Sequence, residues 1–431
     1  MPYGNAWRDQ RKIYQTLLSV SAVGSFRPMQ EAEATLTLHH LMETPGKYYD
    51  HLRRTATAVI LSSVFGIQAL SFDDPKIQRL YHVQEQFTAI AETGASPPVD
   101  IFPIFKWLPN FMAPWRERAL QIRHEQRELY FELLRDVQES RSKGIRRNCF
   151  MDQLLEESAR SKHKLDDEHL AYIGGVLMEG GSDTTAANLL SFLLAMVKYP
   201  HVLRKAQAAV DEVCGTQRSP TFDDLARLPY LKCCVDEILR WRPAAPSGIP
   251  HMLIQGPVPH ATLRIKAPLS SAYTVSKYQQ MIHMRATIFQ KAQLAIHHDP
   301  ELYEDPNEFI PERYELQEFG FKPGFEVSEG LRKTYGFGAG RRVCPGSHLA
   351  TNSLAINTAK IIWAFDIRPG KDPITGLDLT PDDISVDIEK QWTNGILVAP
   401  KPFPVSLTVR SDIHRTIIQE ELRRSHEAFQ G

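Results

Sequence analysis

One cysteine stands in a setting that supports chemistry. The segment from Phe337 to Gly346 is FGAGRRVCPG, in which two glycines and two arginines lead into Cys344, just before a predicted helix. Nearby arginines and a helix N-terminus both favour an ionised sulfur, because each places positive charge beside it. The loop is compatible with a thiolate metal ligand, a nucleophilic cysteine or a phosphate-binding loop. Its glycine spacing fits neither common phosphate fingerprint, and a nucleophile would need a histidine base that sequence cannot place.

The other four cysteines lack such a setting and are interpreted as packing or surface residues: Cys149, Cys214, Cys233 and Cys234. Five cysteines are an odd and sparse set, and no C-x-x-C spacing occurs. The sequence therefore favours neither a disulfide framework nor a zinc ribbon, and it indicates a reducing compartment.

A second unusual feature is a predicted helix over residues 166–199 that contains Gly174, Gly175, Gly180 and Gly181. Each interior glycine disfavours a helix by about 0.8 to 1 kcal/mol relative to alanine. We therefore expect a kink or the close approach of a bulky group at these positions. An acid and a hydroxyl, Asp183 and Thr184, follow the second glycine pair directly.

The rest of the chain must position these residues, and most of it has helical periodicity. Helices are expected within 6–70, including 51–65, and at 115–142, 202–213, 230–241 and about 347–365. Residues 249–295 and 396–409 have strand-like patterns, and 308–334 is predicted coil. No repeat or linker divides the chain, so we expect one domain over residues 1–431, mainly α with small β-sheets.

Composition excludes several classes of protein. Lys and Arg total 50 against 51 Asp and Glu, a net charge of −1, which removes the case for a nucleic-acid binder built on positive charge. The longest apolar run, residues 189–197, falls well short of the roughly 20 residues that a membrane span requires. Residues 1–10 contain no apolar core of a signal peptide.

Four blocks, taken in order, resemble one known family. The pattern F-x-x-G-x-R-x-C-x-G at 337–346 is similar to the haem-ligand loop of cytochromes P-450. Three more blocks agree with it: GGSDTT at 180–185, EILR at 237–240 and FIPERY at 309–314. With Trp7-x-x-x-Arg11 near the start, the resemblance spans essentially the whole chain. Residues 1–24 and 295–301 resemble fungal microsomal members of secondary metabolism.

The resemblance implies a haem b site with named roles. Cys344 would be the proximal thiolate ligand of the iron, which favours O–O cleavage. Gly181 would let the macrocycle approach the long helix, and Phe337 belongs to the ligand loop. The haem propionates would contact Trp7, Arg11, His251 and Arg342.

Asp183 and Thr184 resemble the family's acid–alcohol pair, which relays protons to iron-bound oxygen. The structural alternative is a threonine that bonds back to its own helix beside an aspartate in an ordinary salt bridge.

Glu237 and Arg240 illustrate a conflict between periodicity and resemblance. Their helix face points away from Leu231, Val235 and Ile238, which indicates a solvated pair. The resemblance instead implies a buried structural network with Arg313 beneath the haem loop, and we follow it.

Tyr314 stands where the family commonly has Phe. The motif 297–300 (HHDP) is interpreted as turn-capping rather than a metal site, because adjacent side chains diverge.

The implied activity is monooxygenation of a small hydrophobic substrate, with O2 as co-substrate. The chain has no flavin or nicotinamide fingerprint, so the electrons of NADPH would come through a separate NADPH-cytochrome P-450 reductase. The alternatives are a haem-thiolate isomerase or dehydratase, and a non-catalytic product of a damaged gene. The family would place the protein on the cytosolic face of the endoplasmic reticulum membrane; the chain as written is expected to be soluble and cytoplasmic.

Two departures from the family pattern stand out. Only residues 1–6 precede Trp7, where the family ordinarily has a membrane anchor, a hinge and the first sheet strands, so we interpret the chain as N-terminally truncated. Residues 255–286 stand where the family has a compact hairpin, and we interpret them as an anomalous insertion. Both departures predict that the chain holds haem poorly, because an uncovered core layer costs more than the marginal stability of a domain.

Overall fold

The protein is described by a computed structural model of residues 1–431. The structure describes every residue except 1–3, 93–94, 98, 100–101, 161–164, 250, 253–287, 290–292, 328–331 and 431, and it gives the backbone alone at 103, 251–252, 288–289 and 426–430. The anomalous stretch 255–286 and the side chain of His251 therefore lie outside the described part of the chain.

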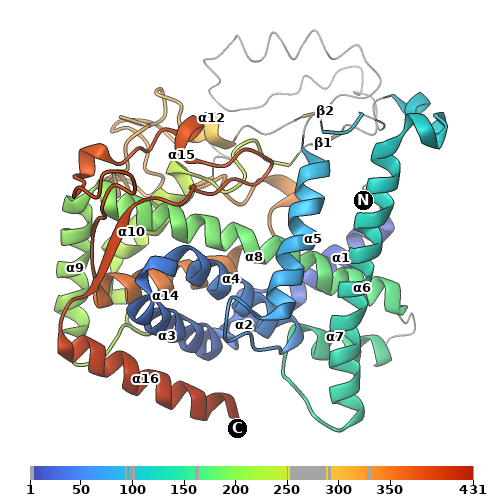
Figure 1. Ribbon diagram of the computed structural model, residues 1–431, viewed down its shortest axis with the longest axis horizontal. Coiled ribbons are helices and arrows are strands. Elements are labelled where there is room, and N and C mark those ends of the chain that lie inside the picture. The colour runs from blue at the N-terminus through green and yellow to red at the C-terminus, as the bar shows by residue number, and fades with distance from the viewer. Residues whose placement is uncertain are drawn as a thin grey trace.

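Helices dominate the described residues (Figure 1), as the sequence predicts. The α-helices are α1 (Asn5–Leu17), α2 (Val20–Gly24), α3 (Arg27–Glu43), α4 (Tyr48–Phe65), α5 (Pro75–Ala91), α6 (Pro114–Ser142), α7 (Phe150–Arg160), α8 (Asp167–Lys198), α9 (Pro200–Cys214), α10 (Pro229–Trp241), α12 (Gln293–His297), α13 (Arg313–Leu316), α14 (Ser347–Ala364), α15 (Ile388–Gln391) and α16 (Asp412–Gln430). Short 3-10 turns lie at Pro45–Lys47, Pro103–Trp107, Asn110–Met112, Leu225–Arg227, Gly340–Arg342 and Pro381–Asp383.

Two small antiparallel sheets occur in the described part. β1 (His251–Met252) pairs with β2 (Ile288–Phe289), and β3 (Phe365–Pro369) pairs with β4 (Val405–Val409) with Ile367 opposite Leu407. The mainly α class with small sheets is confirmed. Of the expected strand over 396–409, however, only Val405–Val409 pairs in a sheet.

The long helix α8 is the central element that positions the site. Figure 1 shows it passing through the middle of the molecule, with α4 beside it. Its C-terminal half is buried on all sides, which explains the continuous apolar sequence of residues 189–197. Asp166 caps its N-terminus by accepting a hydrogen bond from the His169 backbone N–H at 2.8 Å. Pro200 opens α9, so α8 ends at Lys198.

Two of the glycines of α8 allow the close approach of bulky groups, one of the two reasons that the sequence predicts. A Cβ at Gly175 would lie 2.4 Å from the Tyr130 ring, and one at Gly181 would lie 2.7 Å from Cδ1 of Ile60. Both glycines therefore admit side chains of neighbouring helices, and Gly181 also lines the cavity described below. A Cβ added at Gly180, by contrast, would have no atom within 4 Å.

The C-terminal helix α16 has no counterpart in the sequence-based expectations. It packs on α3, and Glu421 contacts the buried Nζ of Lys360 on α14 at 3.4 Å.

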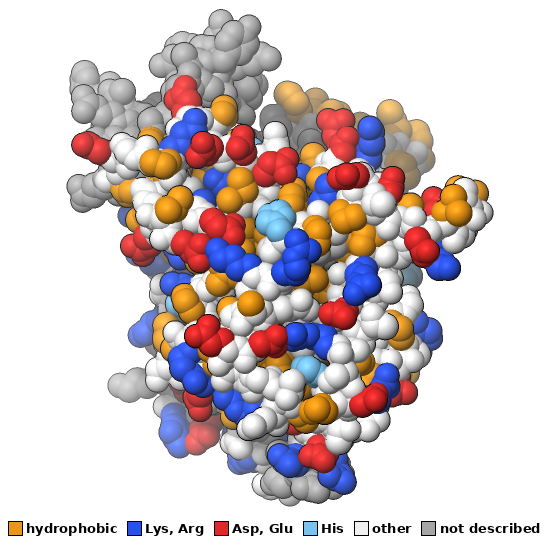
Figure 2. Space-filling model, turned by 90° about the vertical axis from the view of Figure 1, so that its left-hand side faces the viewer, with side chains coloured by type: hydrophobic (Ala, Val, Ile, Leu, Met, Phe, Trp, Pro, Cys, Tyr) orange, Lys and Arg blue, Asp and Glu red, His pale blue; other side chains and the backbone are white. Residues whose placement is uncertain are grey.

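No single helix within the described ranges is long and apolar enough to cross a membrane. The helices α8 and α9, which are bent by 106° relative to each other, have the required length and apolar composition when they are taken together. On the face that Figure 2 shows, basic and acidic side chains are interspersed.

Candidate functional site

The backbone of the 337–346 loop fixes where the Cys344 sulfur lies. Gly338 and Gly340 have φ angles of 75° and 71°, a left-handed conformation that glycine adopts without a steric penalty. The Cys344 backbone N–H donates to the carbonyl oxygen of Phe337 at 2.9 Å, which closes the loop. Helix α14 begins three residues later at Ser347. The turn thus presents the sulfur between a closed loop and a helix N-terminus.

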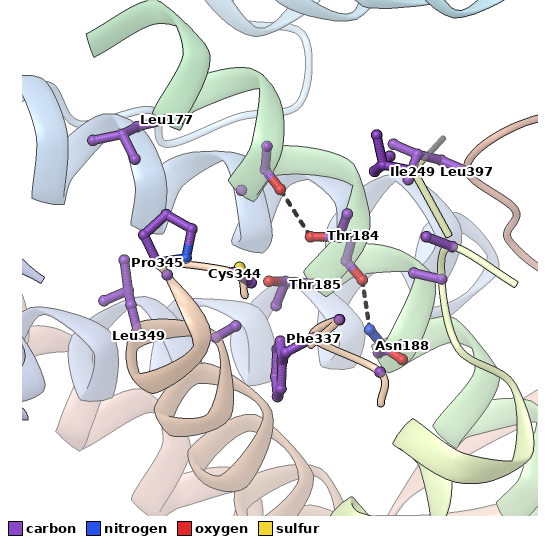
Figure 3. A pocket seen from close by; sticks show the side chains of 18 of the residues that line it. Leu177, Thr184, Thr185, Asn188, Ile249, Phe337, Cys344, Pro345, Leu349 and Leu397 are labelled. Carbon is purple, nitrogen blue, oxygen red and sulfur yellow. Dashed lines mark hydrogen bonds between the residues drawn. The ribbon is translucent and has the colours of Figure 1, made fainter. Parts of the chain in front are cut away.

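Cys344 lines a cavity of about 560 Å³, a size typical of small-molecule sites. Figure 3 shows four of the lining side chains, Cys344 and Phe337 from the loop and Thr184 and Thr185 from α8. The wall is mostly apolar and includes Phe87, Val176, Leu177, Ile249, Leu349 and Leu397. Such a cavity suits a flat or compact apolar molecule next to one thiol.

Burial, rather than neighbouring charge, dominates the electrostatics at Cys344. It raises the pKa of the thiol, while the Gly346 backbone N–H and the Arg11 guanidinium act in the opposite direction. The Arg11 guanidinium of α1 thus favours the thiolate from a part of the chain far from the loop in sequence. The other four cysteines are buried and do not line the cavity.

Asp183 and Thr184 lie next to each other on α8 but face different surroundings. The Thr184 hydroxyl lines the cavity and donates to the Gly180 carbonyl oxygen at 2.9 Å (Figure 3). Asp183 does not line the cavity; its carboxylate lies 3.7 Å from the Arg53 guanidinium. This is the geometry of the structural alternative, and it leaves the hydroxyl, but not the acid, at the cavity.

Three of the four expected propionate contacts can be placed. Arg342 lines the cavity, and its guanidinium lies 4.8 Å from the centroid of the Trp7 ring. Arg11 donates from Nη1 to the Val343 carbonyl oxygen at 2.6 Å, and its Nε is buried without a hydrogen-bond partner. The structure thus brings Trp7, Arg11 and Arg342 to the ligand loop, although only Arg342 lines the cavity.

The residues present fit haem. One thiol lines the cavity, and within the described residues no group of three or more His, Cys, Asp or Glu side chains could hold a metal ion. The apolar wall, the open space at Gly180, the cations Arg342 and Arg11 and the N–H donor of Trp7 match a flat apolar ring with anionic edges.

Glu237, Arg240 and Arg313 meet in a buried network, and the surface interpretation from periodicity is wrong. Glu237 and Arg240 are fully buried and form a two-pronged pair with both distances 2.7 Å. Arg313 donates to Glu237 at 3.2 Å. Arg240 also donates to the carbonyl oxygens of Pro306 and Glu308, so each charge is satisfied.

The network continues to the ligand loop through His297. Arg240 donates to the His297 carbonyl oxygen at 2.8 Å, and the His297 Nε2 accepts the backbone N–H of Tyr335 at 3.0 Å. Tyr335 lies two residues before Phe337. Burial lowers the pKa of His297 to about 3, so this ring is neutral and can accept that bond. The histidine motif is structural, as expected.

Some residues at the site were not anticipated. Thr185 and Asn188 line the cavity, and Arg53 of α4 is the ionic partner of Asp183. Thr185 and Asn188 share a helix face with Gly181 and Thr184, because residues three or four positions apart lie on the same side of a helix. The sequence therefore did contain a signal for them. Arg53 lies 130 positions before Asp183, and no local pattern connects them.

Comparison with known proteins agrees with this geometry. The model for "Cytochrome P450" matches residues 1–267 and 276–389. Cytochrome P450 monooxygenase atE of Aspergillus terreus is 35% identical over 433 residues, covering 100% of this chain and 75% of the relative. Cytochrome P450 monooxygenases acuD of Aspergillus aculeatus and patI of Penicillium expansum are 34% and 33% identical, each over 100% of this chain and 76% of the relative. A match over most of the chain, with a loop cysteine at an apolar cavity opposite Thr184, shows that this protein belongs to the cytochrome P450 family of monooxygenases.

Proposed function

We propose that the protein is a haem-thiolate monooxygenase that inserts one atom of O2 into a small hydrophobic organic substrate in fungal secondary metabolism. The observation that carries this proposal is that Cys344, alone among the five cysteines, lines an apolar cavity that Thr184 of α8 also lines. Its relatives by sequence are fungal monooxygenases of the same family.

Cys344 would hold the iron of haem b, and Arg342, Arg11 and Trp7 would hold its propionates, with the His251 side chain as a further candidate. Haem bound to a thiolate supplies the activation of O2, because the sulfur donates electron density to the iron. The apolar wall binds the substrate and excludes water, so polar interactions inside the cavity are stronger than in solution. Electrons of NADPH would come from a separate reductase, and the family would place the protein at the endoplasmic reticulum membrane.

The Thr184 hydroxyl would hold and pass on the proton that the reaction needs at the cavity. Its hydroxyl donates to the Gly180 carbonyl oxygen, which leaves the oxygen lone pairs free to accept a second hydrogen bond from the cavity side. Asp183 is one residue away and would supply the proton. Correctly timed proton delivery contributes typically about 10²- to 10⁴-fold to such a rate.

Oxygen labelling tests the reaction class. Purified holoprotein, a P450 reductase and NADPH are incubated under ¹⁸O2 with toluene and with naphthalene, two small apolar probes that fit the lining. We expect a product with one ¹⁸O atom, formed only with reductase and NADPH present. A product that forms without NADPH and contains no label would favour an isomerase or dehydratase instead.

Thr184→Ala separates the role of the hydroxyl from haem binding. The variant should retain its haem and consume NADPH, but release more peroxide and less product per NADPH. Ser182→Ala is the matched control, because the Ser182 hydroxyl is buried on the same helix, donates to Gln84 and does not line the cavity. Equal product yield in Thr184→Ala and the parent would remove Thr184 from the mechanism.

A further inference from the structure

Among the described residues, five side chains with a hydroxyl group line the cavity, and one of these hydroxyls has no partner in the described part of the protein. Four of them hydrogen-bond to another residue at 2.7 to 2.9 Å: Tyr14, Thr88, Thr184 and Ser353. The fifth, Thr185, makes no hydrogen bond with any residue that the structure describes. In Figure 3 the dashed lines involve Thr184 and Asn188 but not Thr185. The bonding capacity of the Thr185 hydroxyl is therefore unused.

The free hydroxyl of Thr185 is an exception among the threonines of the helices. A helical threonine can donate to the carbonyl oxygen four residues earlier, as Thr35, Thr37 and Thr358 do at 3.0, 2.8 and 2.7 Å. The corresponding acceptor for Thr185 is the Gly181 carbonyl, and that bond is not formed. Thr185 is only 6% exposed. A buried hydroxyl without a partner is unfavourable, and an acceptor atom on a ligand would satisfy it.

The next polar side chain on this face of α8 cannot take the place of Thr185. Asn188 lies three residues further on and also lines the cavity. Its Nδ2 donates to the Thr184 carbonyl oxygen at 2.8 Å, and its Oδ1 is buried without a partner. The nitrogen is thus bound to the helix backbone, and the enclosed oxygen cannot donate. The Thr184 hydroxyl already donates to Gly180. Thr185 is therefore the side chain of α8 that can donate to a ligand without breaking a bond.

We propose that Thr185 is a specificity-determining residue whose hydroxyl donates a hydrogen bond to one acceptor oxygen on the substrate. The substrate would be a small, mainly apolar molecule that carries such an oxygen, of which a ketone is the simplest. This inference rests on the proposed function, because it concerns the substrate of the same cavity. An apolar molecule can turn within an apolar wall, whereas one bond to a rigid helix fixes its orientation. Thr185 thus decides which position of the substrate is oxidised.

Two ligands of similar shape test the hydrogen bond directly. Acetophenone carries a carbonyl oxygen, and ethylbenzene has a CH2 group at the same position. The Kd of each is measured by equilibrium dialysis against the holoprotein, so the result does not depend on turnover. The ratio of the ethylbenzene Kd to the acetophenone Kd should fall by about 3- to 10-fold in Thr185→Val, the size of effect that one neutral hydrogen bond gives. Comparing this ratio between variants cancels the different hydration of the two ligands.

Two further variants separate the hydroxyl from the shape of the side chain. Thr185→Ser retains a donor and should keep the parent ratio. Thr88→Val is the matched control, because Thr88 also lines the cavity but its hydroxyl donates to the Gln84 carbonyl oxygen at 2.9 Å. It should keep the parent ratio as well. An unchanged ratio in Thr185→Val, or an equal change in Thr88→Val, would overturn the inference. A lower haem content in Thr185→Val with an unchanged ratio would overturn it too, since the hydroxyl would then serve the cofactor.

Product analysis tests the orienting role. The parent should oxidise acetophenone mainly at one position, whereas Thr185→Val should give several positional isomers and a higher KM at a similar kcat. The same isomer distribution in both proteins would contradict orientation by Thr185. If the Kd ratio shifts as expected but no ¹⁸O enters any product, the proposed function fails while the binding role of Thr185 stands. If labelled product forms and the ratio does not shift, only this inference fails.

Discussion

Arg11 Nη1 donates a hydrogen bond to the carbonyl oxygen of Val343 across 2.6 Å, which ties the first helix to the residue before Cys344. The two residues are 332 positions apart, so this bond joins the N-terminal helix to a loop near the other end of the chain. It also places a positive charge near the sulfur, which acts against the effect of burial on the pKa of the thiol.

Arg11→Gln should therefore destabilise the conformation of the 337–346 loop. A hydrogen bond from a charged donor contributes about 1.5 to 3 kcal/mol, and the loop conformation depends on it. We expect a lower haem-to-protein ratio and a lower Tm than in Lys12→Gln, which changes an exposed charge on the same helix. Haem content is measured from the pyridine haemochrome, and equal content in the two variants would contradict the role of Arg11.

The glycines of α8 predict a contrast between two alanine substitutions. Gly175→Ala should destabilise the fold by about 1 to 3 kcal/mol, because the new methyl group would overlap the Tyr130 ring. Gly180→Ala meets no atom and should be neutral or stabilising by up to about 1 kcal/mol, since alanine is the better helix former. Urea unfolding of both variants measures this difference, and equal destabilisation would show that packing does not require Gly175.

The buried ion pair predicts a large loss of stability. Glu237→Gln leaves the fully buried guanidinium of Arg240 without its anion, and breaking such a pair costs about 3 to 5 kcal/mol. Glu156→Gln removes an exposed pair with Arg160 on α7 and should change little. Differential scanning calorimetry compares the two, and similar Tm values would mean that the network does not support the fold.

His297 predicts a loss of stability in mild acid. Its pKa is lowered from 6.5 to about 3 by burial, so the unfolded chain binds one more proton between these values. The contribution of this residue is complete above pH 6.5 and declines as the pH falls toward 3, by about 1.4 kcal/mol for each pH unit. His297→Gln should have a shallower dependence of unfolding free energy on pH between 6.5 and 5, and a slope equal to that of the parent would contradict this role of His297.

Local patterns in the sequence were enough to predict most helices. The expected helix at 166–199 became α8 (Asp167–Lys198), and the one at 230–241 became α10 (Pro229–Trp241), because apolar periodicity and a following proline mark these elements. The C-terminal helix α16 was missed. Its mixed and mostly polar sequence is stabilised by distant contacts, among them the pair of Glu421 with Lys360.

The site shows where local reasoning stops. Periodicity placed Glu237 on the surface, because a local pattern contains no information about Arg313, which lies 76 positions away and pairs with the buried carboxylate. It also could not show that Gly181 accommodates Ile60, or that Asp183 faces Arg53. The motif order identified the family, but each of these contacts depends on which helices become neighbours.

The ligation of iron by Cys344 is tested most directly by the reduced, CO-bound difference spectrum of the purified protein. The haem that the parent and Cys233→Ala bind, however low its content, should give a thiolate-type band, because Cys233 is buried away from the cavity. Cys344→Ala should lose that band. A thiolate-type band that persists in Cys344→Ala would contradict the account.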